Sequence, residues 1–251
     1  MSVPVRADTL QWPVIQSIGV DGMLVSFSDN LSEAANRAAL AFRAALDRAE
    51  VVGVEETSTS LASAYLRFDL RVTDHDTVRT ALDALLQNTD WYAAALPTGR
   101  TLWRVPTVFG TDLAPQLDEA AEMAGLSPDQ AVAALCAEPL RVQAIGFAPG
   151  QPYLGQLPAE WDIPRQTGLT PQVPEGALAV AIRQMVLFSV STPTGWRHVG
   201  QTALRLFRPD QPDPFMLRPG DEVQFFPVTR EEFENIRQSD PAGGATAQAV
   251  A

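Results

Sequence analysis

The sequence is notable for what it lacks. All 18 basic residues are arginine, so no lysine is present to carry a biotinyl group. The single cysteine, Cys136, excludes a disulfide within the chain. Two histidines and one cysteine that lie far apart do not compose a structural zinc site, so we expect no metal site. Cys136 ends an alanine-rich segment without a neighbouring cation, which is typical of a buried, unreactive thiol.

Long apolar runs and phosphate-binding loops are also missing. No stretch approaches the roughly 20 apolar residues that span a bilayer, and the N-terminus lacks the apolar run of a signal peptide. The spacing GxxxxGKS/T, which cradles phosphates, does not occur. The formal charge of −12 repels nucleic acid and anionic membranes. We therefore expect a cytoplasmic protein that binds neither nucleic acid nor membrane.

Strand-like and helix-like segments alternate over the first 95 residues. Two short strands surround a turn at Gly19–Gly22, and a helix follows with Ser32 as its N-cap. Two more strands and a second helix complete the order ββαββα. This order predicts an α+β N-terminal domain over residues 1–95. His75 is interpreted as an exposed residue in front of the second helix.

A second domain is predicted over residues 96–238, beginning at the Gly/Pro/Thr cluster of residues 96–99. One strand and two short helices come first. The first of these helices carries three acidic residues that we interpret as a solvated face: Asp118, Glu119 and Glu122. Short strands with Gly/Pro turns follow and favour a β-barrel or a sandwich. Thr229 and Glu232 predict a capping box on a closing helix. Residues 239–251 are small, polar and aperiodic, and we expect a disordered tail.

The stretch "IGFAPGQPYLGQL" at residues 145–157 has an unusual composition. Proline fixes φ and removes a donor, whereas glycine admits positive φ and close approach of a ligand. We interpret the stretch as a shaped turn that is neither helix nor central strand. It is either a structural connection or the wall of a pocket.

Five ordered motifs of the second half resemble one family: "GFAPGQPYLGQLP", "IPRQ", "VPEGALAVAIRQ", "GWRHVGQTALRLF" and "LRPGDEVQFFPV". This is the family of allophanate hydrolase subunit 1, the carboxyltransferase subdomains C and D, the B subunit of 5-oxoprolinase and the KipI-like kinase inhibitors. The resemblance covers roughly residues 14–236. It implies a small α+β domain followed by a mainly-β, cyclophilin-like barrel.

The resemblance implies three functions. The leading hypothesis is the B subunit of a 5-oxoprolinase-like, ATP-dependent hydrolase that opens a lactam or another small polar amide. It would contribute a barrel pocket and act with a companion chain that is allophanate hydrolase subunit 2-like, as the C subunit of 5-oxoprolinase is, with ATP bound by or shared with that companion. The alternatives are a non-catalytic KipI-like regulator and a carboxyltransferase component of the urea carboxylase or allophanate hydrolase type.

Seven residues in the motifs are candidates for the site. Arg165 and Arg183 could bind a substrate carboxylate or form structural salt bridges, and Gln184 could hydrogen-bond an amide. His198, which alternates with Trp196 along a strand, is the candidate acid/base residue or a satisfied barrel residue. The wall of the pocket would be shaped by the remaining three: Gly146, Gly150 and Tyr153.

Three positions depart from the family pattern. Leu135 stands where a histidine is usual, Gln151 where an aromatic residue is usual, and Gln201 where an arginine is usual. These changes remove an imidazole, a ring and a guanidinium from the expected site, and they bear on catalysis more than on the fold.

Overall fold

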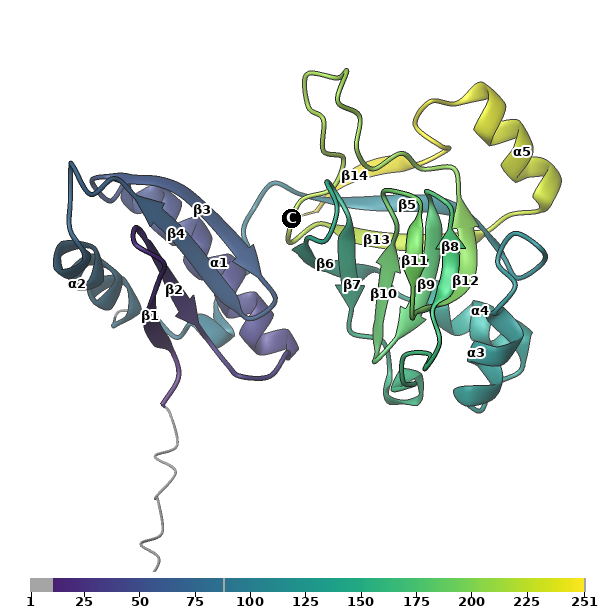
Figure 1. Cartoon of the computed structure of the whole chain (residues 1–251), viewed down its shortest axis with the longest axis horizontal. Coiled ribbons are helices and arrows are strands. Elements are labelled where there is room, and N and C mark those ends of the chain that lie inside the picture. The colour runs from purple at the N-terminus through teal and green to yellow at the C-terminus, as the bar shows by residue number, and fades with distance from the viewer. Residues whose placement is uncertain (1–10, 88, 251) are drawn as a thin grey trace, which may run out of the picture. The chain divides into compact units, whose positions relative to one another are not determined.

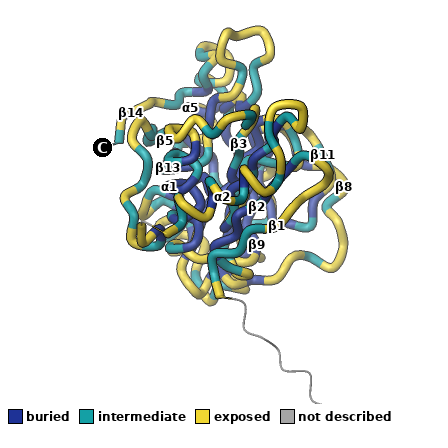
Figure 2. Tube along the Cα trace, turned by 90° about the vertical axis from the view of Figure 1, so that its left-hand side faces the viewer, coloured by how far each residue is buried: buried dark blue, intermediate teal, exposed yellow. Residues whose placement is uncertain are grey.

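The structure is a computed structural model that describes residues 11–87 and 89–250. Its contacts divide the chain into two compact units, of which the first ends at Pro97 and the second begins at Thr98. The sequence placed this boundary two residues earlier, between residues 95 and 96. Each unit has its own hydrophobic core. Figure 2 shows the buried positions along the strands and inner helix faces, and exposed positions mainly on the connecting loops.

The first unit is an antiparallel sheet in the order β1-β2-β4-β3, with one helix between β2 and β3 along the chain and a second helix after β4. Its elements are β1 (Val14–Ile18), β2 (Gly22–Ser26), α1 (Glu33–Ala49), β3 (Val54–Ser60), β4 (Ser63–Phe68), α2 (His75–Leu86) and the 3-10 turn η1 (Trp91–Ala93) (Figure 1). The predicted cap is confirmed, because Ser32 Oγ accepts from the Ala35 N–H at 3.1 Å. His75 is half-buried rather than exposed, because it is the first residue of α2 and meets the Phe68 ring edge-on at 5.0 Å.

The second unit contains a closed barrel of seven strands, in the order β6-β13-β5-β12-β9-β10-β7, and β7 pairs back onto β6. These strands are β5 (Arg100–Phe109), β6 (Leu140–Ile145), β7 (Pro152–Gly155), β9 (Ala177–Ala181), β10 (Gln184–Leu187), β12 (Arg197–Thr202) and β13 (Glu222–Pro227) (Figure 1). The barrel alternative is thus the one that the chain adopts. β7 was not predicted. Its Pro152 is tolerated because it is the first residue of the strand.

The inside of the barrel is filled by its own side chains. On β9, Leu178 and Val180 belong to the inner core, whereas the small residues Ala177, Ala179 and Ala181 belong to a separate cluster on the outer face. The other six strands each add buried apolar residues to the inner core, and Trp161 is completely buried there. A pocket inside the barrel, as the sequence led us to expect, is therefore absent from the described residues.

Further elements cover the outside of the barrel. β8 (Thr170–Val173) and β11 (Thr192–Thr194) form a separate two-stranded ribbon. Helix α3 (Leu117–Met123) contacts β12, α4 (Pro128–Cys136) contacts β13, and α5 (Arg230–Ser239) contacts β5. A second 3-10 turn is η2 (Ala159–Trp161). The predicted capping box of α5 is confirmed, because Thr229 and Glu232 bond reciprocally.

The predicted disordered tail is wrong for residues 246–250. This segment forms strand β14 (Thr246–Val250), which pairs antiparallel with β5 over Arg100–Arg104. β12 pairs only with Thr107–Phe109 of the same strand, so the first half of β5 has an open edge. Backbone groups at an open edge pair with another strand whatever its side chains are, which is why a polar composition did not prevent strand formation.

Candidate functional site

The stretch at residues 145–157 is mainly a six-residue hairpin loop between β6 and β7. The Gly146 N–H donates to the Gln151 carbonyl at 3.0 Å, and the Gln151 N–H donates to the Ala148 carbonyl at 3.1 Å. Gly150 has φ +71°, and a Cβ on it would lie 3.1 Å from the Leu206 carbonyl oxygen, so glycine is required there. Phe147 has φ +73°, and its side chain is 72% exposed. The loop is thus held by two internal hydrogen bonds, and it presents the Phe147 ring to solvent.

The loop forms one wall of a small cavity, which we call the loop hollow. Its volume is about 260 Å³. The Arg165 guanidinium lies 5.1 Å from the Trp196 ring, and Tyr153 meets that ring edge-on at 6.3 Å. The remaining lining includes Phe147, Gln151, Gln166, Leu169, Val186 and Phe188. Two of the seven candidates, Arg165 and Tyr153, are thus brought together.

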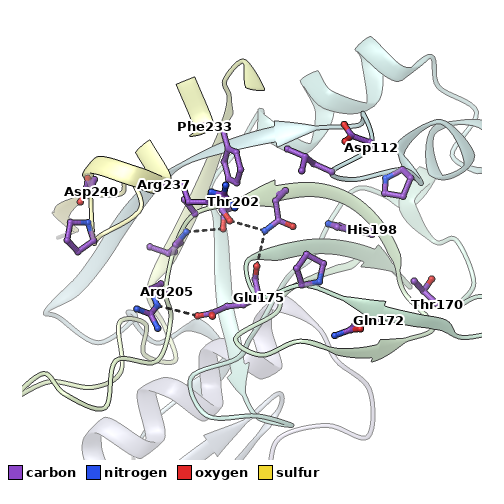
Figure 3. Close-up of a pocket in the computed structure, with 17 residues that line it drawn as sticks. Asp112, Thr170, Gln172, Glu175, His198, Thr202, Arg205, Phe233, Arg237 and Asp240 are labelled. Atoms are coloured by element: carbon purple, nitrogen blue, oxygen red, sulfur yellow. Dashed lines mark hydrogen bonds and ion pairs between the residues drawn. The ribbon is translucent and has the colours of Figure 1, made fainter. Parts of the chain in front are cut away.

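A second cavity of about 680 Å³, the histidine hollow, contains His198. It lies among β12, β8, α5 and the segment that follows β5 (Figure 3). Gln201 Nε2 donates to the carbonyls of Glu175 at 2.9 Å and Thr202 at 3.0 Å, and its Oε1 has no partner among the described residues. The charged residues of the lining are Asp112, Glu175, Arg205, Arg237 and Asp240.

A bulge in β12 brings His198 and Gln201 to the same face. Residues three apart on a regular strand face opposite sides. Here His198 pairs with Ala179 and Gln201 pairs with Ala177, because the pairing of β12 with β9 shifts between His198 and Gly200. Both alanines face outward, so both polar side chains do as well. Spacing alone predicts the opposite for Gln201.

The imidazole of His198 is neutral at pH 7. The residue is 4% exposed, and burial lowers its pKa, against smaller opposing contributions from the Gly200 backbone and the Gln201 side chain. Its Nε2 has no hydrogen-bond partner within the described residues. The backbone N–H of His198 donates to Gln116 Oε1 at 2.9 Å, and Gln116 Nε2 donates to Gln166 Oε1 at 2.8 Å. This network links the linings of the two hollows.

Four candidates line neither hollow in the described part of the chain. Arg183 lies in the turn between β9 and β10, and its Nε donates to the Leu157 carbonyl at 3.0 Å. Gln184 is buried, and its Nε2 donates to Gln143 Oε1 at 3.0 Å. Gly146 and Gly150 shape the hairpin loop instead. The structure thus gives Arg183 and Gln184 internal contacts, and their predicted substrate contacts remain predictions.

Sequence reasoning missed Arg197, which fixes α3 to the barrel. Its side chain is 6% exposed, and its Nε donates to Glu119 Oε1 at 2.8 Å. Its Nη1 also donates to the Pro164 carbonyl at 2.6 Å. Asp118, Glu119 and Glu122 are all exposed, as predicted, and Glu119 is in addition the ion-pair partner of Arg197. The sequence offered one signal for Arg197, which is its place next to His198 in "WRHV".

The described residues contain no metal-binding cluster. No group of three or more His, Cys, Asp or Glu side chains among them is placed to hold a metal ion. Three carboxylates and two arginines line the histidine hollow, and Glu175 pairs with Arg205 at 3.8 Å. Burial raises the pKa of the Cys136 thiol to about 12.

Over residues 11–87 and 89–250, none of the helices has the length and apolar character needed to cross a membrane.

Comparison with known proteins identifies the family. The family model of the carboxyltransferase domain, subdomain C and D, matches residues 13–217. The chain belongs to this family. The family predicted from the five motifs is confirmed, and the barrel with its two outer hollows is therefore a carboxyltransferase C/D barrel.

Relatives within the family carry one name. The B subunit of 5-oxoprolinase from Bacillus subtilis (strain 168) is 26% identical over 231 residues, which are 89% of this chain and 96% of the relative. The protein of the same name from Escherichia coli O157:H7 is 36% identical over 149 residues, or 59% of this chain and 68% of the relative. Both names describe one subunit of a larger protein.

A solved structure has a similar fold. The crystal structure of TTHA0988 matches 83% of this chain with a TM-score of 0.68 and 31% identity. This chain covers 40% of TTHA0988, so it spans less than half the length of that protein.

Proposed function

We propose that the chain is the B subunit of a 5-oxoprolinase-like, ATP-dependent hydrolase that opens a lactam or a related small amide. The observation that carries the proposal is the match to the 5-oxoprolinase B subunit of Bacillus subtilis, over 89% of this chain and 96% of that protein. The finer description of the barrel as cyclophilin-like belongs to the same proposal.

The histidine hollow supplies the chemistry that a hydrolase needs. Opening an amide requires a nucleophile at the carbonyl carbon and a proton for the departing nitrogen. A neutral imidazole with an unpaired nitrogen accepts a proton from water and can return it to the leaving group. His198 combines these properties, because it is neutral through burial and its Nε2 is unpaired among the described residues.

ATP and the remaining catalytic groups are assigned to a companion chain. The phosphate-binding spacing GxxxxGKS/T is missing from the sequence, and the chain has a formal charge of −12, which repels a triphosphate. We propose that the companion is an allophanate hydrolase subunit 2-like chain, the counterpart of the 5-oxoprolinase C subunit. Bound ATP would supply the free energy for ring opening.

Reconstitution tests the proposal. The chain is purified with the product of a neighbouring gene that encodes the companion, and glutamate release from 5-oxoproline is measured with and without ATP. We expect release only when the chain, its companions and ATP are all present. If the full set of subunits assembles and releases no glutamate, the proposed activity is wrong.

A KipI-like regulatory role is the second candidate. Leu135 and Gln201, which replace a histidine and an arginine of the family pattern, favour it because they remove an imidazole and a guanidinium. Inhibition of a partner kinase by a complex without turnover would support this role. Transfer of a carboxyl group from a supplied carboxybiotin donor to urea, with release of free biotin, would instead support the carboxyltransferase alternative.

A further inference from the structure

The loop hollow contains a buried side-chain amide oxygen without a hydrogen-bond partner among the described residues. Gln151 is 1% exposed, and the unpaired atom is its Oε1. Buried polar groups in folded proteins are nearly always paired, so an unpaired amide oxygen in a cavity wall indicates a ligand. A glutamine amide both donates and accepts, and a half-turn of the side chain exchanges its two ends.

Both backbone groups of Gln151 are hydrogen-bonded, so the position of its Cα and the start of its side chain are fixed. Its N–H donates to the Ala148 carbonyl and its carbonyl accepts from the Gly146 N–H, at 3.1 and 3.0 Å. A side-chain amide recognises hydrogen-bonding groups rather than apolar surface. Gln151 therefore gives this hollow a polar selectivity.

A cation lies in the lining of the same hollow. Arg165 is exposed and stacks on the Trp196 ring at 5.1 Å, and no carboxylate of the described residues forms an ion pair with it. Stacking restricts the guanidinium and leaves its N–H edge able to bind a carboxylate through two hydrogen bonds. The ligand therefore carries a negative charge at this end.

The rest of the cavity suits a compact apolar body. Val186, Phe188 and Trp196 are each buried, and Tyr153 packs against this cluster. The volume of about 260 Å³ accommodates a small molecule but not an extended chain. A ring or short aliphatic segment can pack on these side chains while its polar groups reach the arginine and the glutamine.

We propose that the loop hollow is a binding site, separate from the histidine hollow in which His198 acts, for a small carboxylate that also carries an amide, with Arg165 binding the carboxylate and Gln151 pairing with the amide. The choice of 5-oxoproline as the natural probe rests on the proposed function. The assignment of the carboxylate to Arg165 and of the amide to Gln151 goes beyond the proposed function. The hollow is already formed by residues of one unit, so the chain alone binds the ligand.

Three probes separate the two contacts: 5-oxoproline has both groups, cyclopentanecarboxylate lacks the amide, and 2-pyrrolidinone lacks the carboxylate. Binding to the purified full chain is measured by calorimetry or saturation-transfer NMR. Arg165→Gln should lower the affinity for 5-oxoproline and for cyclopentanecarboxylate at least about tenfold and leave the affinity for 2-pyrrolidinone unchanged. Gln151→Leu should lower the affinity for 5-oxoproline and for 2-pyrrolidinone and leave the affinity for cyclopentanecarboxylate unchanged. Retained binding of the unaffected probe also shows that each variant is folded.

Arg218→Gln and Gln211→Leu are matched controls, because both residues are exposed and lie outside the hollow. They should leave the binding of all three probes unchanged. The inference is overturned if 5-oxoproline binding survives both hollow substitutions, or if none of the probes binds at tens of millimolar. Failure of the proposed function would be a different result: probes bind through Arg165 and Gln151, but the complete complex does not convert 5-oxoproline.

Discussion

His198 is a buried residue in the wall of a polar hollow, and its Nε2 has no hydrogen-bond partner among residues 11–87 and 89–250. Strand alternation correctly predicts that it shares a face with Trp196, because both lie over the outer alanine cluster. Gln201 could not be placed in this way, since its orientation depends on the shifted pairing between His198 and Gly200. The register of one strand against its neighbour is a tertiary property that a single sequence does not encode locally.

Burial of His198 makes the stability of the fold depend on pH. In the unfolded chain the imidazole takes up a proton near its ordinary pKa, whereas the folded chain keeps it neutral to a lower pH. Between the two pKa values the unfolded state binds more protons, so the free energy of unfolding falls as the pH is lowered through that window. Urea unfolding between about pH 7.5 and 5.5 measures the decrease.

The variant His198→Gln serves as the comparison, because it removes the titrating group and retains a polar side chain. Its free energy of unfolding should change less over the same pH range. Carboxylates with lowered pKa values, such as Asp69 at about 2, titrate below this range. Identical pH dependence in the two proteins would show that His198 is not held neutral by the fold.

At the scale of elements, sequence patterns located most helices and strands, and capping residues set several helix ends. The Thr229–Glu232 capping box forms as predicted, and Ser127 and Gln130 form a second box on α4, since capping depends on residues only three apart. β7 and β14 escaped prediction, because "PYLG" is short and begins with proline and "TAQAV" is polar. Both segments are strands because neighbouring strands offer them unpaired backbone groups.

The β9–β10 hairpin carries strain that a substitution can relieve. Its turn residues Ile182 and Arg183 have φ of +44° and +60°, a two-residue turn that favours Asn-Gly. A β-branched residue at positive φ is destabilised by about 1–2 kcal/mol, and Ile182 is 43% exposed, so it has little packing to lose. Ile182→Asn should raise the free energy of unfolding by about 1 kcal/mol in urea titrations.

Val190→Asn is the control for this substitution. Val190 is 37% exposed and does not have a positive φ, so its replacement by asparagine should give no gain in stability. A gain of equal size at both positions would mean that surface polarity, rather than relief of strain, is responsible.

The C-terminal strand is predicted to be part of the stability of the barrel. β14 pairs with Arg100–Arg104 of β5, and a Cβ on Gly243 would lie 2.5 Å from backbone atoms of Ala203, so the preceding turn packs closely. Deletion of residues 243–251 should lower the free energy of unfolding by roughly 2 kcal/mol or more, because several backbone hydrogen bonds are lost. Urea unfolding of the shortened chain tests this, and unchanged stability would contradict the observed pairing.

At the scale of the whole molecule, two units with separate cores divide near the Gly/Pro/Thr cluster that the sequence suggested. The five ordered motifs identified the family because they preserve the loop, the turns and the barrel strands together. The motifs could not predict that Arg165 and Tyr153 line one hollow and His198 another. Both hollows lie on the outside of a barrel whose interior is filled, and which residues line each one depends on the tertiary packing of the covering loops and helices.

In the proposed function, this chain contributes His198 to an ATP-dependent hydrolase that a companion chain completes. Glutamate and ADP are measured together, with 5-oxoproline as substrate, in complexes that contain either the wild-type chain or His198→Gln. We expect the wild-type complex to form glutamate only with ATP hydrolysis, and the variant to assemble normally but to form glutamate at least about a hundredfold more slowly. A wild-type complex that forms no glutamate, or a variant that forms it at an undiminished rate, would show that His198 does not have the proposed role.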